Sequence, residues 1–346
     1  MAWENKKLIK MLHVINQKVI KCIQQIQSGS DPRKTEFNEA CKLIRQYFIE
    51  DPVFRLRFNN TFRNGLVLNV GDKEMEPLAY LVSRLSEMLY KRGWIFSQLF
   101  CFHIFCDLEN CDMLEIGGYT SSKVADLFHF RSYIGTGLDD SIKFREMYEE
   151  DHRAPNWKFI HLDIQDSKST QNINSRTRIF STACFEHILD LEICLQNCFD
   201  IMDEKGYLYS YIAPIWTYPN GGQHGYTNKK LIPNQEDQFG FHLLQTREQI
   251  SKLRSMGINK ENISEILSYL HFNDDVNQHS FEYYQRVLTE SKFLCLKFDE
   301  IQNLNISKYN PETIRRIRTH LPAAKLTTIG IRTLLSKNIT PEYLFY

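Results

Sequence analysis

The sequence predicts an α/β fold in which a mostly parallel sheet carries helices on both faces. Two observations lead to this prediction. From about residue 111 to 215, short apolar runs alternate with helical patterns, which is typical of β-α-β units. A turn with two glycines, Gly117 and Gly118, joins the first apolar run to the next helical pattern. The length of 346 residues leaves room for this sheet and for additions on either side.

The first part of the chain is expected to be helical. Apolar residues from Leu8 to Ile26 recur at alternating spacings of four and three, which places a heptad-like seam on one helix face. A helix this short is marginal alone, so its seam must be buried against its own chain or in a homodimer. Asp51-Pro52 ends the second helix. The helices expected in this part cover residues 8–26, 36–49, 76–91 and 94–106.

Five apolar runs in the middle of the chain and two near its end are predicted to be the strands of the sheet. A helix at 190–202, stopped by Gly206, separates the fourth strand from the fifth. A loop at 218–222 and helical patterns at 246–256 and 260–270 come before the last two strands. The seven strands are expected at residues 113–116, 133–138, 159–162, 178–182, 207–212, 293–298 and 326–335.

These patterns divide the chain into two regions. A helical N-terminal region is expected at residues 1–108. The α/β domain is expected at residues 109–346, with a helical insertion over about 225–290.

Composition disfavours several classes of protein. Lysine plus arginine equal aspartate plus glutamate, at 42 each, whereas general nucleic-acid binders carry a basic excess. The most apolar window, Trp94–Cys106, is too short to span a bilayer, and the N-terminus has no signal-peptide pattern. The nine cysteines lack the close pairs of a zinc site and fit reduced thiols. We therefore expect a cytoplasmic protein with no metal, no membrane insertion and no nucleic-acid partner.

Acidic residues stand at the ends of three successive predicted strands: Glu115, Asp139 and Asp163. In open α/β sheets, ligands bind at the carboxyl ends of the strands, so these three side chains should lie at one binding edge. Asp139 follows Glu115 by 24 residues, close to the offset of a ribose-binding carboxylate. Asp163 is suited to accept from an adenine amino group while Ile164 packs on the ring. The pattern indicates a nucleoside-containing ligand.

Four segments of this stretch occur in a characteristic order: Leu114–Gly118, Gly137–Asp139, Leu162–Ile164, and Ser181–Asp190 with its Phe-Glu-His sequence. Together they resemble the class I S-adenosylmethionine-dependent methyltransferases. The similarity is close over residues 111–215, looser over 225–340, and absent from the first hundred residues. It implies a Rossmann-like, seven-stranded sheet whose last two strands pair, with S-adenosyl-L-methionine as cofactor.

The resemblance also implies roles for individual residues. Glu115 would fix the loop that holds the methionine end, Asp139 would hold the ribose hydroxyls, and Asp163 would frame the adenine with Ile164. Glu186 and His187 would line the pocket near the transferring methyl group. The complete set of implied cofactor-binding residues is Glu115, Gly117, Gly118, Tyr119, Asp139, Asp140, Asp163, Ile164 and Cys184.

The loop after the fifth strand supplies a candidate base, His224, among aromatic neighbours. A histidine titrates near neutral pH, so His224 is the residue expected to deprotonate a hydroxyl acceptor, with His187 and Glu186 as further catalytic candidates. The motifs of nucleic-acid methyltransferases, Asn-Pro-Pro-Tyr and a Pro-Cys nucleophile, are missing at the expected places. Aromatic residues within 241–284 suit a covered small acceptor. We expect a small-molecule acceptor, with a sugar hydroxyl favoured.

The chain departs from the family at its first motif. Tyr119 and Ser121 occupy the second and third glycine positions of the family's Gly-x-Gly-x-Gly pattern. Two outcomes are open. The side chains of Tyr119 and Ser121 crowd the cofactor, or the hydroxyl groups of Thr120, Ser121 and Ser122 form hydrogen bonds with its carboxylate. The first outcome motivates an alternative function, a non-catalytic binding module that kept the fold. A nicotinamide oxidoreductase is less favoured because the full Gly-x-Gly-x-x-Gly fingerprint is missing.

Overall fold

The computed structural model describes residues 2–31, 35–62, 73, 75–89, 93–118, 120–138, 157–219, 232, 240–272, 276–302 and 310–338. Seven strands within these ranges form one sheet in the order β3-β2-β1-β4-β5-β7-β6. Strands β1 to β5 pair in parallel, and β7 runs antiparallel to both β5 and β6. The strands are β1 (Asp112–Ile116), β2 (Ser132–Gly137), β3 (Trp157–His161), β4 (Arg176–Thr182), β5 (Met202–Ile212), β6 (Leu294–Gln302) and β7 (Thr328–Ser336).

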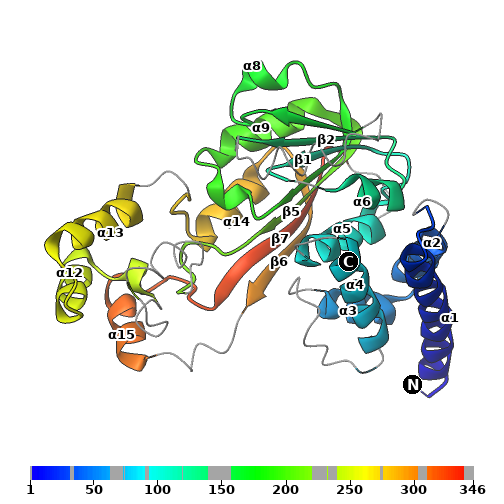
Figure 1. Cartoon of the computed structure of the whole chain (residues 1–346), viewed down its shortest axis with the longest axis horizontal. Coiled ribbons are helices and arrows are strands. Elements are labelled where there is room, and N and C mark those ends of the chain that lie inside the picture. Colours follow the sequence, from blue (N-terminus) through cyan, green and yellow to red (C-terminus); the bar gives the residue numbers. More distant parts are fainter. Residues whose placement is uncertain are drawn as a thin grey trace.

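Helices cover both faces of this sheet, so the predicted Rossmann-like, mostly parallel seven-stranded fold is confirmed. Figure 1 shows α9 (Leu191–Ile201) and α14 (Phe281–Glu290) on one face and α4 (Glu76–Leu89) and α5 (Gly93–Cys106) on the other. Two short helices, α6 (Ser122–Leu127) and α8 (Ser167–Thr170), follow β1 and β3.

The two faces of the sheet belong to two separate hydrophobic cores. Successive side chains of a strand point to opposite faces. Met113 and Tyr209 accordingly pack under the N-terminal helices, while Leu114 and Leu208 pack under α9 and α14. This alternation fixes the register of each strand, because a shift by one residue would exchange the two sets.

Strand β5 begins earlier than predicted, at Met202 rather than Tyr207. Arg176 of β4 pairs with Met202, and Arg178 pairs with Tyr207, so the residues between Met202 and Tyr207 bulge out of the register. The predicted helix therefore ends at Ile201 and not at Met202.

The N-terminal helices are α1 (Ala2–Gln27), α2 (Phe37–Glu50) and α3 (Pro52–Thr61), followed by α4 and α5. The seam of α1 is buried in the chain's own core, where its members pack against α2 and α4. Burial within the chain is thus the arrangement found, and a homodimer through α1 stays a prediction. The buried seam residues are Leu12, Ile15, Val19 and Cys22.

The sequence pattern does not predict helix α3, because Asp51-Pro52 indicates only the end of the preceding helix. The same dipeptide also starts α3. The Asp51 carboxylate accepts hydrogen bonds from the amides of Val53 (2.9 Å) and Phe54 (3.0 Å), and Pro52 occupies the first turn, where a missing N–H costs little.

A third, smaller hydrophobic core lies beyond one end of the sheet (Figure 1). Around it gather η3 (Phe241–Leu243), α12 (Thr246–Ser255), α13 (Lys260–Phe272) and α15 (Pro311–His320). Helices α12 and α13 fall inside the predicted insertion, whereas α15 lies between β6 and β7. The exact domain boundaries stay a prediction. No helix in the described ranges has both the length and the apolar character needed to cross a bilayer.

Arg332 of β7 is fully buried and joins the sheet to the N-terminal helices. Its Nε and Nη2 donate to Asp299 Oδ2 of β6 at 2.9 and 2.6 Å, and its Nη1 donates to the Phe62 carbonyl at 2.7 Å. Burial alone would raise the pKa of the Asp299 carboxyl, but the nearby charges of Arg332 and Lys297 outweigh it and lower the pKa. The pair is therefore ionised and desolvated together.

Replacing Asp299 by Ala should lower the free energy of unfolding by about 3–5 kcal/mol, because it leaves the buried guanidinium of Arg332 without a counter-charge. Urea denaturation measures the loss. Glu87→Ala, which removes a partner of the exposed Arg84, is the matched control and should change stability by no more than about 0.5 kcal/mol. Equal effects of the two substitutions would contradict the role given to the buried pair.

Candidate active site

The carboxylate of Glu115 lies beneath the turn that follows β1. The side chain is fully buried, and its Oε2 accepts hydrogen bonds from the Thr120 amide (3.0 Å) and the Tyr133 hydroxyl (2.5 Å). The Thr120 amide also donates to the Tyr133 oxygen at 2.9 Å. Through these hydrogen bonds, Glu115 fixes the segment after β1 against β2.

Both residues of the glycine turn, Gly117 and Gly118, are required by space. A Cβ atom on Gly118 would lie 1.9 Å from Glu115 Oε1, and one on Gly117 would lie 2.2 Å from Cys184 Sγ. Gly117 also has φ +70°, a conformation that disfavours other residues. The backbone of this turn thus passes directly between the side chains of Glu115 and Cys184.

The segment after β4, residues 183–188, approaches the glycine turn from the neighbouring strand. Ala183 adopts φ +48°, an unusual value for a residue with a side chain. Its amide donates to the Tyr211 carbonyl of β5 at 2.9 Å. Cys184 follows, and burial raises the pKa of its thiol to about 12, so the thiol is protonated at neutral pH. Cys184 therefore acts as a packing surface for the turn.

Glu186 lies in the short helix η2 (Phe185–His187) of the same segment. Its side chain is only 1% exposed, and neither carboxylate oxygen has a hydrogen-bond partner among the residues that the structure describes. Burial raises the pKa of Glu186 well above its usual range. A buried ionised carboxylate without a partner is very costly, so this group stays protonated.

Asn277 holds the segment that carries Glu186. Its backbone amide donates a hydrogen bond to the Glu186 carbonyl at 2.8 Å. Its side-chain Nδ2 donates to the carbonyls of Phe185 (2.8 Å) and Ile188 (2.6 Å). The Tyr284 hydroxyl of α14 donates to Asn277 Oδ1 at 2.5 Å. Sequence reasoning missed this residue, since an asparagine between two helical patterns carries no signal of such contacts.

Asp163 and Ile164 lie just beyond the carboxyl end of β3. Asp163 Oδ1 accepts hydrogen bonds from the Gln165 amide (2.9 Å) and from Gln165 Nε2 (3.3 Å). Ile164 is buried, and its carbonyl accepts from Asn197 Nδ2 at 2.8 Å. Asp163 and Ile164, which are predicted to frame the adenine, therefore have a fixed conformation. They follow β3, which lies two strands away from the glycine turn after β1.

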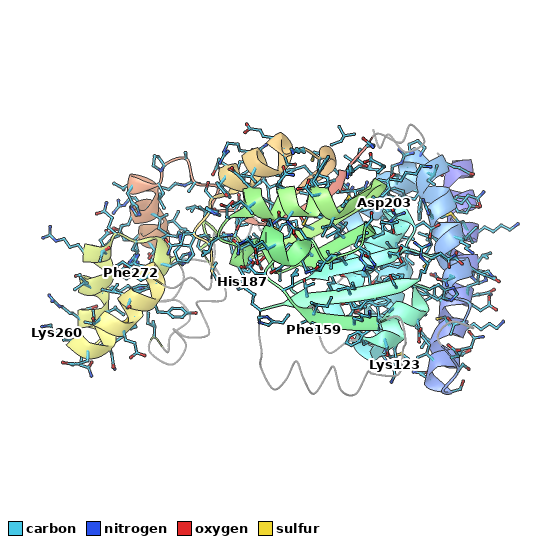
Figure 2. All side chains as sticks on the ribbon, turned by 90° about the horizontal axis from the view of Figure 1, so that it is seen from above. Lys123, Phe159, His187, Asp203, Lys260 and Phe272 are labelled. Carbon is cyan, nitrogen blue, oxygen red and sulfur yellow. The ribbon has the colours of Figure 1, made fainter. Side chains whose placement is uncertain are left out.

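The described part of the site lies at one end of the sheet. Figure 2 shows His187 at the end nearest α12 and α13, and Asp203, at the start of β5, toward the opposite end. The structure thus brings together Glu115, the glycine turn, Cys184 and the Glu186 segment at the carboxyl edge of β1 and β4. The remaining predicted site residues, Tyr119, Asp139, Asp140 and His224, lie outside the described residues.

The arrangement fits a ligand that needs close backbone contact and a buried polar partner. The glycine turn has no room for a side chain, and Glu186 supplies a nearby carboxyl group that has no hydrogen-bond partner among the described residues. Within the described ranges, no group of three or more His, Cys, Asp or Glu residues could hold a metal ion.

The raised pKa of Glu186 predicts a pH-dependent cost to stability. Below about pH 4.3, the usual pKa of glutamate, folded and unfolded chains both carry the proton. Above it the unfolded chain loses the proton first, so the free energy of unfolding contributed by this group falls by about 1.4 kcal/mol per pH unit until the folded pKa is reached.

Urea denaturation of the wild type and of Glu186→Gln at several pH values isolates this effect, because all other titrating groups are common to both chains. The variant should gain stability relative to the wild type as the pH rises from about 4.3. Parallel stability curves would show that Glu186 is ionised or paired in the folded protein.

No protein-family model matches the sequence, and no curated protein matches it. Several solved structures are similar at low identity. One, provisionally named a sarcosine dimethylglycine methyltransferase, comes from Galdieria sulphuraria, with 13% identity, a TM-score of 0.42, and coverage of 86% of this chain and 99% of that chain. The CMeT domain of the citrinin polyketide synthase has 15% identity and a TM-score of 0.40, over 89% of this chain and 70% of that one.

A third structure, an S-adenosylmethionine-dependent methyltransferase from Mesorhizobium loti, has 9% identity and a TM-score of 0.38, over 66% of this chain and 92% of that one. Because these scores and identities are low, the fold is assigned from the chain's own strand order, in which β7 lies antiparallel between β5 and β6.

Proposed function

We propose that this protein is an S-adenosylmethionine-dependent methyltransferase that acts on a small molecule. The observation that carries the proposal is the glycine turn after β1, which Glu115 fixes from below and which has no space for a side chain. It lies at the carboxyl edge of the parallel strands, where ligands of open α/β sheets bind. A turn of this kind allows backbone atoms to approach a ligand closely.

In this proposal the donor lies along the carboxyl ends of β1, β2 and β3. The glycine turn holds its methionine end, Asp139 and Asp140 hold the ribose, and Asp163 with Ile164 frames the adenine. The donor supplies a methyl group already activated on a sulfonium. The protein then has to align the acceptor and exclude water.

The acceptor is proposed to be a small molecule with a hydroxyl group, most suitably a sugar. Helices α12 and α13 lie beyond the end of the sheet that carries His187 (Figure 2), and the acceptor is proposed to bind on this side. A non-catalytic binding module is the alternative, motivated by Tyr119 and Ser121. Donor binding without turnover on any acceptor would favour it.

Donor binding is the first test. S-adenosylmethionine and its demethylated product should each raise the melting temperature, since a ligand that binds only the folded state adds about 2.7 kcal/mol at a hundred times its dissociation constant. Asp139→Ala should weaken this shift by removing the ribose contacts. Asp203→Ala, at an exposed position at the far end of the sheet, is the matched control and should leave it unchanged. If neither ligand at millimolar concentration shifts the wild-type melt, the proposed function is wrong.

His224 is the proposed base for a hydroxyl acceptor. His224→Ala should lower turnover by about a hundredfold to ten-thousandfold while donor affinity stays the same. His13→Ala, at an exposed position on α1, should leave both unchanged. Steady-state kinetics with labelled donor, together with a donor titration, separate the two effects. Full turnover in His224→Ala would assign the proton transfer to another group.

A further inference from the structure

We propose that Glu186 is the counter-ion of the positively charged methyl donor and that it releases its proton to solvent when the donor binds. This inference rests on the proposed function and goes beyond it, since it assigns a ligand charge to a particular carboxyl group. It also predicts that donor and product bind with different proton stoichiometry.

The starting point is the state of Glu186 without a ligand. The side chain is 1% exposed, and its two oxygens have no hydrogen-bond partner in the described part of the chain. Transfer of an isolated carboxylate into a protein interior costs so much that the group binds a proton instead. Without a ligand, Glu186 is therefore a neutral carboxylic acid that has no hydrogen-bond partner among the described residues.

The groups around Glu186 do not include a described cation. Cys184 precedes it in the same segment, Tyr211 faces it from β5, and Tyr284 faces it from α14. Burial, and after it the nearby Glu186, raises the pKa of Tyr211 to about 12, so this phenol is neutral at neutral pH. Burial likewise raises the pKa of Tyr284, whose hydroxyl already donates a hydrogen bond to Asn277 Oδ1. His187 is adjacent in sequence and half-buried.

The position of Glu186 brings it to the donor's side of the sheet. It lies two residues after Cys184, whose sulfur would be 2.2 Å from a Cβ atom on Gly117. Ile116, at the end of β1, pairs directly with Ser181 of β4. The segment that carries Glu186 and the turn that would hold the methionine end are therefore adjacent.

The backbone around Glu186 is fixed, so the side chain has no easy route to water. Asn277 donates hydrogen bonds to the carbonyls of Phe185, Glu186 and Ile188, and it is itself 3% exposed. Moving the segment that carries Glu186 toward solvent would break this set of buried hydrogen bonds, each of which is costly to leave unmade. Stabilisation of the charge must then come from outside the described residues, and we assign that role to the ligand.

The methyl donor carries that charge, and its product does not. The sulfonium of S-adenosylmethionine is positive, whereas the thioether of the product is neutral. A positive charge within a few ångströms in a poorly solvated site favours ionised carboxylate. When the donor binds, the Glu186 carboxylic acid becomes a carboxylate, and one proton passes to solvent. After methyl transfer the sulfonium charge is gone, and the carboxylate takes up a proton again.

Isothermal titration calorimetry in buffers of different ionisation enthalpy measures the protons released at about pH 6, where the ligands' amino groups remain protonated. S-adenosylmethionine should release about one proton per site, and its affinity should rise by about tenfold per pH unit. The demethylated product should release about none. Glu186→Gln should abolish proton release on donor binding, while Glu192→Gln, on the exposed surface of α9, should keep it.

Equal proton release with donor and product, or unchanged release in Glu186→Gln, would overturn this inference while the proposed function stands. Failure of both ligands to bind the wild type would overturn the proposed function itself. If Glu186→Gln does not fold, the comparison of donor with product on the wild-type protein decides the question alone.

Discussion

The buried ion pair between Arg332 and Asp299 connects parts of the chain that are far apart in sequence. Its guanidinium also binds the carbonyl of Phe62, 270 positions earlier, and lies 5.8 Å from the centre of the Phe105 ring. The two antiparallel strands at the edge of the sheet and the N-terminal helices thus share one desolvated charge. Because a lone buried charge is so unfavourable, these elements have to assemble together.

Buried carboxyl groups serve different purposes at the two turns of the site. Glu115 is held by a backbone amide and a phenol, and so shapes the glycine turn. Glu186 has no such partner in the described structure, although it is as deeply buried. The hydrogen bonds to Glu115 Oε2 make the turn rigid, whereas a buried polar group without a partner stores free energy that a suitable ligand recovers on binding. The site therefore combines a fixed cradle with a residue whose partner has to come from outside the described chain.

Local patterns in the sequence predicted the strands and most helices, because apolar periodicity and turn residues act over a few neighbouring positions. They missed α3, since Asp51-Pro52 both ends one helix and begins another. They also missed the clamp by Asn277, whose side chain bonds to Phe185, 92 positions earlier. The glycine turn is visible in the sequence itself and Glu186 stands out by resemblance, but the absence of a described partner for Glu186 follows only from packing. Long-range contacts of this kind have no short sequence signature.

The third hydrophobic core has a dynamic consequence. Helices α12, α13 and α15 bury their apolar residues against one another, in a cluster separate from the two cores that cover the sheet. A group of elements with its own small core can open as a cooperative unit at a lower free energy than global unfolding. Hydrogen exchange in these helices would then be faster than in β1 and β4. Such opening would leave the strands of the sheet undisturbed, because their apolar residues belong to the other two cores.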